Sequence, residues 1–444
     1  MDIIGMFLRK TSGAKGKTMK RTFGKIWLVA LVFCSAAVHA EGLLVRIDMS
    51  GDVQEALQEA LILAEPGTVI EIGEGRFEFS GALSLDIPNV KVRGAGMDKT
   101  ILSFTNQKSG SEGFLITSDN AWIEGLAIEN TPGDGIKAKG VDTVTFKNVR
   151  VEWTRGPNSE NGAYGLYPVE SKNVLIDGAV VKGASDAGIY VGQSQQIIVR
   201  NSRAELNVAG IEIENSYYAD VHDNITTHNT GGILIFDLPN LPQMGGHSVR
   251  VFNNKSISND VANFAPPGNI VGTVPRGTGI MVMANRDVEV FSNEIGDNPT
   301  VNVLIATYPR EFDDPNYNPF ARNVYVHDNT YGKAGYEPDT LVAELVQPKT
   351  GLPIPDIVWD GAVDGIWAAF FGPDKDDAIY IDEKEGTSFA NLDFVYDMIV
   401  PWDAEVDRDI NSYKGAIDVR SAVQLPQDAA GDTVWTAAEN QTGG

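Results

Sequence analysis

Apolar residues recur along most of the chain at intervals of 22 or 23 residues. One strand pattern is a glycine, or once an asparagine, followed by an aliphatic residue, and these aliphatic residues are Ile136, Leu166, Ile189, Ile211, Ile233, Ile280 and Val303. A second strand pattern ends in Asn or Gly and alternates with the first, as at 174–178 and 197–201. Two interleaved patterns that share one period predict a coil, each turn of which contains about three short strands.

Parallel stacking of such turns places equivalent residues about 4.8 Å apart. The aliphatic residues are therefore expected to form one continuous inward column. Asparagines are expected to stack at one bend, where their amides satisfy backbone groups of the next turn, and these are Asn201, Asn224, Asn254, Asn293 and Asn329. The pattern thus predicts an all-β fold, a parallel β-helix that forms a single-stranded solenoid over residues 41–335.

The two ends of this solenoid need covers. Residues 53–64 have the apolar spacing of an amphipathic helix, with Ser50 or Asp52 as its cap, and we expect this helix to close the N-terminal end. Residues 336–444 hold 22 acids against six bases, and the 22-residue rhythm fades there. This acidic C-terminal extension is expected to pack on the solenoid or cap it, with a disordered tail at 427–444.

Several gaps between repeats are longer than one period and are rich in Pro, Gly and Asn. These insertions are expected to be loops that leave the coil, at 155–163, 238–247, 260–276 and 309–321. In repeat proteins such loops often build the functional face.

The first 40 residues have the pattern of a secretory signal peptide. A basic segment at 20–25 precedes a short apolar stretch at 26–36, and small residues provide a cleavage site after Ala40. Translation is expected to start at Met19, with Met1–Thr18 a misassigned extension. The mature chain is therefore expected to be periplasmic or secreted, without insertion into a membrane.

Removal of this segment makes the net charge of the chain more negative. The mature chain keeps 35 − 7 = 28 basic and 60 − 1 = 59 acidic residues, a net charge of about −31 with His neutral. Such a surface repels nucleic acid and anionic membranes, so nucleic-acid binding is excluded. Cys34 is the only cysteine, so the mature protein can have no disulfide and no thiolate site.

Four segments resemble known families: NGAYGLYPV (161–169), GASDAGIYVGQS (183–194), NVAGIEIENS (207–216) and NTGGILIFDLP (229–239). With the repeat, they resemble the pectate-lyase-like superfamily of right-handed parallel β-helices, which hosts lyases, hydrolases, epimerases and non-enzymatic scaffolds. More narrowly, they are similar to a bacterial family of exported parallel-β-helix-repeat proteins of unassigned function, often encoded beside a c-type cytochrome. The resemblance implies a right-handed coil, an envelope location and a cytochrome partner, and it transfers no catalytic residue.

Outward positions of the Gly-Ile strands line up as a stripe of polar and aromatic residues. The members expected to bind substrate are Lys137, Tyr167, Tyr190, Phe236 and Asp237. Aromatic rings stack on sugar rings while carboxylates accept hydrogen bonds from hydroxyls, so an exposed stripe of this kind suits a polysaccharide or envelope glycan. A solvated sheet face, half covered by a loop, explains the same pattern without a ligand.

Glu212 and Glu214 are the sharpest candidates for catalysis. Residues i and i+2 of one strand point the same way, about 6.6 Å apart, which allows the carboxyl separations used in glycoside hydrolysis. Asp186 and His228 are expected to join them, the histidine as a general base. Solubilising glutamates and a locally bonded histidine are the structural alternatives.

Three functions therefore stay open at this point. The first is a polysaccharide-recognising protein or envelope scaffold, the second a polysaccharide lyase, epimerase or hydrolase, and the third an acidic partner that docks a basic c-type cytochrome. No cofactor or metal site is predicted. Ca²⁺ binding by the acid-rich segments 374–385 and 403–409 is the alternative to a solvated acidic surface.

Overall fold

A computed structural model describes residues 43–394, 406–418 and 420–426. The expected signal peptide, the tail at 427–444 and part of the acidic segment 403–409 lie outside these residues. The following description concerns the unit that begins at residue 41. No described helix has the length and apolar character that a membrane crossing requires.

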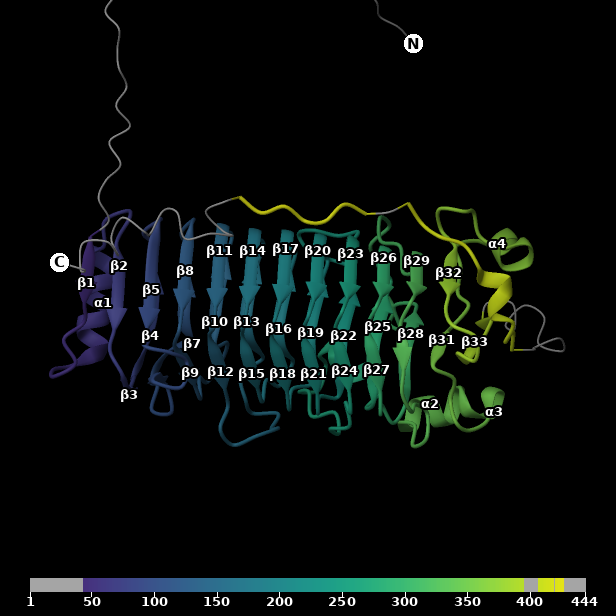
Figure 1. Ribbon diagram of the computed structural model, residues 1–444, viewed down its shortest axis with the longest axis horizontal. Coiled ribbons are helices and arrows are strands. Elements are labelled where there is room, and N and C mark those ends of the chain that lie inside the picture. Colours follow the sequence, from purple (N-terminus) through teal and green to yellow (C-terminus); the bar gives the residue numbers. More distant parts are fainter. Residues whose placement is uncertain (1–42, 395–405, 419, 427–444) are drawn as a thin grey trace, which may run out of the picture. The chain divides into compact units, whose positions relative to one another are not determined.

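The described chain winds through three parallel sheets, one strand of each per turn (Figure 1). Sheet A contains β1 (Leu44–Arg46), β2 (Val69–Ile72), β5 (Val90–Gly94), β8 (Ala121–Glu124), β11 (Asp142–Lys147), β14 (Lys172–Asp177), β17 (Gln195–Arg200), β20 (Tyr217–His222), β23 (His247–Phe252), β26 (Arg286–Phe291), β29 (Arg322–His327) and β32 (Ile379–Asp382). Sheet B contains β3 (Gly75–Glu78), β6 (Thr100–Ser103), β9 (Ala127–Glu129), β12 (Arg150–Glu152), β15 (Val180–Lys182), β18 (Arg203–Glu205), β21 (Ile225–Thr227), β24 (Lys255–Ile257), β27 (Glu294–Gly296) and β30 (Thr330–Tyr331). Sheet C contains β4 (Gly81–Leu85), β7 (Ser109–Ile116), β10 (Ile136–Lys139), β13 (Tyr164–Val169), β16 (Ala187–Gly192), β19 (Ala209–Glu214), β22 (Gly231–Phe236), β25 (Thr278–Met283), β28 (Val301–Ala306), β31 (Ile357–Trp359) and β33 (Phe389–Asn391).

The predicted inward column is confirmed. Strand pairing puts Ile189 beside Ile211 and Ile211 beside Ile233, and all three side chains are fully buried. The preceding glycine is needed because its Cα faces the core: a Cβ on Gly165 would lie 2.3 Å from Cγ1 of Val181, a residue of sheet B. The Gly-Ile motif is therefore a packing motif, in which two successive positions face the interior.

The predicted asparagine ladder is confirmed for four members and corrected for one. Asn224, Asn254, Asn293 and Asn329 are buried, and each amide oxygen from Asn254 onward accepts hydrogen bonds of 2.9–3.0 Å from the preceding asparagine. Asn201 is exposed and binds Asp177 instead, because Ser202 occupies the ladder position of that turn.

A second ladder stacks at the next bend, which the repeat pattern did not predict. It is formed by Asn207, Asn229, Asn259 and Asn298. Asn207 and Asn229 directly precede the strands that carry Glu212 and Leu234. Their amides are used by the backbone of adjacent turns, so their role is structural.

A helix closes the N-terminal end, as predicted. Helix α1 (Val53–Leu63) is capped by Asp52, whose carboxylate accepts from the Glu55 N–H at 3.1 Å, and it buries Val53, Leu57 and Leu61. Gln58 exchanges two hydrogen bonds, of 3.0 and 3.2 Å, with the backbone of Ser84 in the edge strand β4. The helix thereby satisfies backbone groups that a further strand would otherwise pair.

The solenoid extends past residue 335, where the sequence analysis ended it. Strands β31, β32 and β33 continue sheets C and A, and short helices interrupt the rhythm between them: α2 (Thr340–Leu345), α3 (Gln347–Thr350) and α4 (Ile366–Phe371). After the turn η3 (Ile410–Tyr413), residues 414–418 and 420–426 run back along the coil as an extended strap (Figure 1, yellow). Arg420 binds Asp287 at 2.7 Å, and the Val423 N–H donates to Asp220 at 3.0 Å.

Candidate functional site

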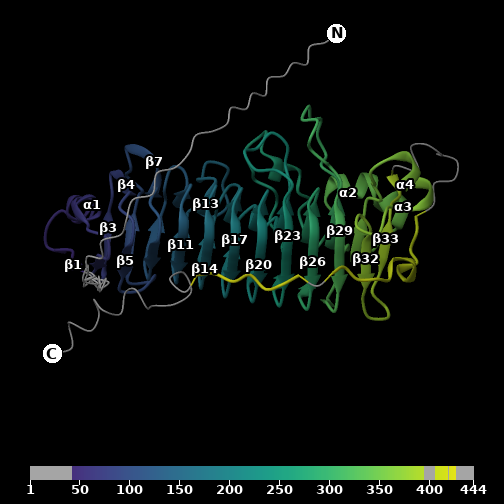
Figure 2. The ribbon, with the colours of Figure 1, turned by 90° about the horizontal axis from the view of Figure 1, so that it is seen from above.

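The predicted stripe lies on the outer face of sheet C, but it is covered rather than exposed. In the middle part of the coil, long loops rise from one side (Figure 2, teal and green). Tyr190, Glu212 and Glu214 keep only 4%, 1% and 6% of their surface exposed, and Phe236 keeps none. The prediction of an open contact surface is therefore wrong for these four residues.

The outward direction of the stripe is nevertheless correct. Glu212 pairs in register with Tyr190 on one side and Leu234 on the other, and all three leave the coil on the same face. The cover comes from side chains of distant loops, among them Val271 and Val274 of loop 260–276 and Tyr317 of loop 309–321, which join these residues in one apolar cluster. Burial here results from loops folding back over the sheet.

Loop 260–276 is fixed over the site by polar contacts at its tip. The Asn269 amide donates to Asp186 at 2.8 Å. Arg310 of loop 309–321 donates to the carbonyls of Gly268 and Asn269 at 2.9 and 2.6 Å. Inside the loop, the turn η1 (Ile270–Thr273) is held by Asn263, which binds two carbonyls at 2.8 and 3.0 Å. The loop is thus an ordered cover with one contact to a buried carboxyl.

Tyr190 and Glu214 form a hydrogen-bonded pair under this cover. The Tyr190 hydroxyl donates to Oε1 of Glu214 at 2.6 Å, and Gln193 donates to the same oxygen at 3.2 Å. The tyrosine ring fills the space above Gly192, where a Cβ would come within 2.3 Å of ring atoms. Glycine at 192 therefore lets the ring lie flat on the strand and reach the glutamate.

Glu212 is buried without a hydrogen-bond partner. Neither of its carboxyl oxygens is bonded to any described residue, although its side chain is almost fully enclosed. A buried polar group left unpaired costs about 1–3 kcal/mol, more when it is charged. Most buried polar groups in proteins are paired, so this carboxyl needs an explanation other than stability.

Burial raises the pKa of all three acids under the cover, Asp186, Glu212 and Glu214. Burial is the main reason that the pKa of Glu212 lies well above its ordinary value, and the charges of Glu214 and Asp186 add to the effect. Burial likewise raises the pKa of Glu214 to about 7, against the hydrogen bond from Tyr190. Burial also raises the pKa of Asp186 to about 7, opposed by hydrogen bonds from Asn269 and Tyr164. Carboxyls with such raised pKa values are more frequent at functional sites than elsewhere.

Tyrosine rings connect this cluster to a more open part of the same face. Tyr164 packs at 4.5 Å, between ring centroids, against both Tyr167 and Tyr190. Tyr164 and Tyr167 are only half-buried. Lys137 lies at this open end, with its ammonium 4.6 Å from the centre of the Tyr167 ring and 3.5 Å from Asp134. The stripe is therefore half open at β10 and β13 and closed at β16 and β19.

Two further predicted residues have structural roles. The Asp237 carboxylate is buried and accepts from the backbone N–H groups of Gly245 and Gly246 at 3.2 and 2.7 Å, so it holds loop 238–247. His228 is half exposed, and its ring is hydrogen-bonded to Asp260 at 2.9 Å. Both residues lie outside the covered cluster, which consists of Asp186, Glu212 and Glu214. Asp237 is therefore corrected from ligand contact to loop anchor, and His228 is not brought to Glu212.

Sequence reasoning missed Tyr164 and Asn269. Tyr164 was overlooked because strict alternation back from Tyr167 assigns it to the inside, whereas the inward turn at Gly165 shifts the phase by one residue. The recurrence of tyrosine in NGAYGLY was the available signal. Asn269 lies in a loop whose path no local pattern specifies, so only its Pro-Pro-Gly-Asn turn chemistry was visible.

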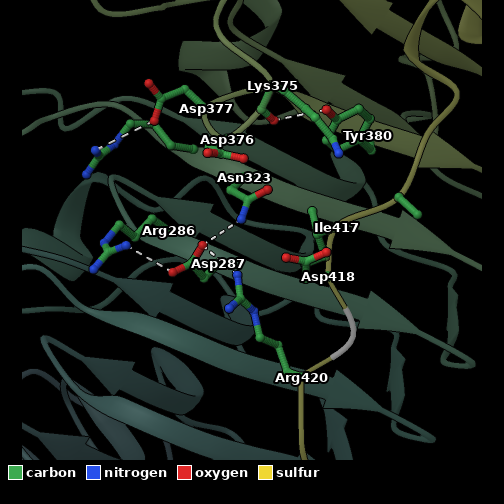
Figure 3. A pocket seen from close by; sticks show the side chains of 12 residues that line it. Arg286, Asp287, Asn323, Lys375, Asp376, Asp377, Tyr380, Ile417, Asp418 and Arg420 are labelled. Carbon is green, nitrogen blue, oxygen red and sulfur yellow. Dashed lines mark hydrogen bonds and ion pairs between the residues drawn. The ribbon is translucent and has the colours of Figure 1, made fainter.

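A separate polar cavity of about 340 Å³ lies between sheet A and the strap (Figure 3). Its centre is Asp287, which binds Arg286 at 3.0 Å, Arg420 at 2.7 Å and Asn323 at 2.6 Å. These pairs satisfy the aspartate and fasten the strap to β26 and β29. Their arrangement is that of a structural junction.

Metal coordination finds no support in the described residues. Within the parts of the chain that the structure describes, no three His, Cys, Asp or Glu side chains are grouped so that they could hold a metal ion. The carboxyls of the covered cluster therefore lie in an arrangement that differs from a coordination sphere.

Residues 112–265 match a family model described as "Right handed beta helix region". This match and the three parallel sheets define the chain as a right-handed parallel β-helix, as predicted. Similar solved structures include the A-module of mannuronan C-5 epimerase AlgE4 from Azotobacter vinelandii, with 14% identity over 75% of this chain and 91% of that chain and a TM-score of 0.48. The N-terminal fragment of bacteriophage phi29 gene product 12 is also similar, with 13% identity over 75% of this chain and 60% of that chain and a TM-score of 0.49. DFA-IIIase from Arthrobacter chlorophenolicus A6 has 10% identity over 77% of this chain and 98% of that chain and a TM-score of 0.47. No curated protein matches the chain. The narrower resemblance to an exported repeat family stays a prediction.

Proposed function

We propose that the chain is an exported polysaccharide-binding protein whose ligand lies on the outer face of sheet C. The basic and apolar pattern of residues 20–36 supports export. The observation that carries the binding proposal is the continuity between the half-open tyrosines and the unpaired Glu212. Sugar rings would stack on Tyr164 and Tyr167, and their hydroxyls would hydrogen-bond the acids and Gln193.

Replacing Tyr167 by alanine tests this surface. Loss of one stacking ring should weaken retention on the bound polysaccharide by about threefold to tenfold. Affinity electrophoresis through gels that contain neutral, acidic or amino polysaccharides measures the retention. Tyr218→Ala is the matched control, because this tyrosine is 47% exposed on sheet A, away from the stripe. Equal retention of the two variants would count against the proposal.

Acid–base chemistry on the bound glycan is the second candidate function. It is favoured by the carboxyls of Asp186 and Glu214, because burial raises the pKa of each to about 7, where one group can donate and another accept a proton near neutral pH. Incubation with the same polysaccharides should then release reducing or unsaturated ends, and Glu214→Gln should abolish the release. Absence of new chain ends with every neutral and acidic polymer would remove this candidate.

A further inference from the structure

The covered cluster is an acidic site without a cation. Asp186, Glu212 and Glu214 lie among tyrosines, amides and one another. None of the described groups that shift the pKa of these acids most is an Arg or a Lys. Lys137, a basic residue of this face, is already engaged by Glu112 at 3.6 Å and Asp134 at 3.5 Å, and Lys139 by Glu170 at 3.8 Å. A cation is therefore what these carboxyls lack.

Unpaired burial of Glu212 is the second, independent observation. Its two oxygens are enclosed beside Glu214 and Asp186 with no donor among the described residues. A cationic donor would satisfy these oxygens and neutralise part of the negative charge. Since the described acids are not grouped as a metal site, a donor that carries N–H hydrogens fits better than a metal ion.

The open end of the stripe shows how this face accommodates an ammonium group. The Lys137 Nζ lies over the Tyr167 ring at 4.6 Å and between two carboxylates. The next part of the stripe offers the same chemistry, with the Tyr164 and Tyr190 rings beside Asp186 and Glu214. An ammonium over a tyrosine ring is stabilised by about 0.5–2 kcal/mol, more strongly when water is excluded.

We propose that Asp186, Glu212 and Glu214 recognise the protonated amino group of a cationic sugar, so that the glycan bound by this protein contains free amino groups. This inference rests on the proposed function and narrows its substrate class. A net charge of about −31 for the mature chain attracts a polycation and repels a polyuronate, which agrees with the acidic character of the site.

Entry of the amino sugar requires a small change at the cover. The half-buried rings of Tyr164 and Tyr167 border the cluster, so a sugar stacked there reaches Asp186 first. The Asn269 amide donates a hydrogen bond to that carboxylate at 2.8 Å, and this hydrogen bond must break. The ammonium would take over the place of the Asn269 amide and then contact Glu214 and Glu212.

Calorimetric titration of the purified protein with two tetrasaccharides tests the inference. One is a tetramer of glucosamine and the other the same tetramer with every amine acetylated, in about 0.15 M salt near pH 7. At that pH, close to the pKa of Asp186 and Glu214, ionised carboxyls and protonated amines are both present. The glucosamine tetramer should bind at least about tenfold more tightly, because acetylation removes the charge that the carboxyls recognise. Equal or tighter binding of the acetylated tetramer overturns the inference and leaves the proposed polysaccharide binding intact.

Two variants separate this site from general attraction to an acidic surface. Glu212→Gln keeps the shape of the side chain and breaks no hydrogen bond, because the Glu212 carboxyl has no partner among the described residues. This variant should bind the glucosamine tetramer about tenfold or more weakly. Glu289→Gln is the control, since Glu289 is also buried but lies on sheet A, beside His327. Unchanged binding by Glu212→Gln, or binding of calcium chloride that depends on Glu212, overturns the inference. If neither tetramer binds the wild-type protein, the inference also fails, and the polysaccharide gels decide separately on the proposed function.

Discussion

Raising the pH from about 4 to about 8 is expected to remove on the order of 3 kcal/mol from the free energy of unfolding through Glu214. Burial raises the pKa of this carboxyl from 4.5 to about 7 in the folded protein. Between these two values the folded state binds more protons than the unfolded state. The contribution of Glu214 to stability is therefore complete below about pH 4 and is lost as the pH rises through about 7.

Denaturant unfolding of the wild-type protein and Glu214→Gln across this pH range isolates the effect. Ion-paired acids such as Glu71 and Glu205 have a lowered pKa, because their partner arginines and lysines outweigh burial, and they act in the opposite direction at low pH. They are shared by both proteins and cancel in the difference. Asp186, Glu212, Asp237, Tyr190 and Gln193 are the groups that face Glu214, and they also remain in both proteins. A difference between the proteins that does not change with pH would show that Glu214 ionises normally.

Replacing Asn254 by alanine should lower the free energy of unfolding by about 3 kcal/mol or more. Its side chain donates to the Val221 carbonyl at 2.9 Å and to Asn293 at 3.0 Å, and its oxygen accepts from both the backbone and the amide of Asn224 at 3.0 Å. Alanine leaves these buried groups unpaired and opens a gap in the ladder.

Asn106→Ala is the control for this change. Asn106 is exposed and makes one long contact, of 3.4 Å, with Glu78. Its replacement should change the free energy of unfolding by less than about 0.5 kcal/mol. Chemical denaturation of both variants gives the comparison. A cost for Asn254→Ala below about 1 kcal/mol would mean that the ladder is not a main stabilising element.

The coil could be predicted from the sequence because its packing is periodic. Ile189, Ile211 and Ile233 contact equivalent residues one turn away, so the spacing along the chain carries the spatial information. The last turns were not predicted, because α2 and α3 separate β30 from β31. These helices hide the sequence period although the sheets continue. The asparagine ladder was placed one residue early in the turn of Asn201, since an Asn-Ser pair there has the exposed residue first.

The candidate site could be predicted only in part. The direction of Tyr190, Glu212 and Glu214 follows from strand alternation, and the sequence gives it correctly. Their burial depends on loops from later turns, and contacts such as Asn269 with Asp186 join residues 83 positions apart. No periodic or local signal specifies such a contact. The same limit explains why Asp237 was taken for a ligand contact, because the loop that it anchors leaves no trace in the strand pattern.

Glu212→Leu tests most directly whether the covered carboxyls serve binding rather than folding. Leucine has a similar size, fits beside its strand partner Leu234, and removes an unpaired polar group. We predict that the free energy of unfolding rises by about 1–3 kcal/mol, while retention on the bound polysaccharide is lost. A variant that is less stable than the wild-type protein yet still retained would contradict the account, because Glu212 would then be a structural residue.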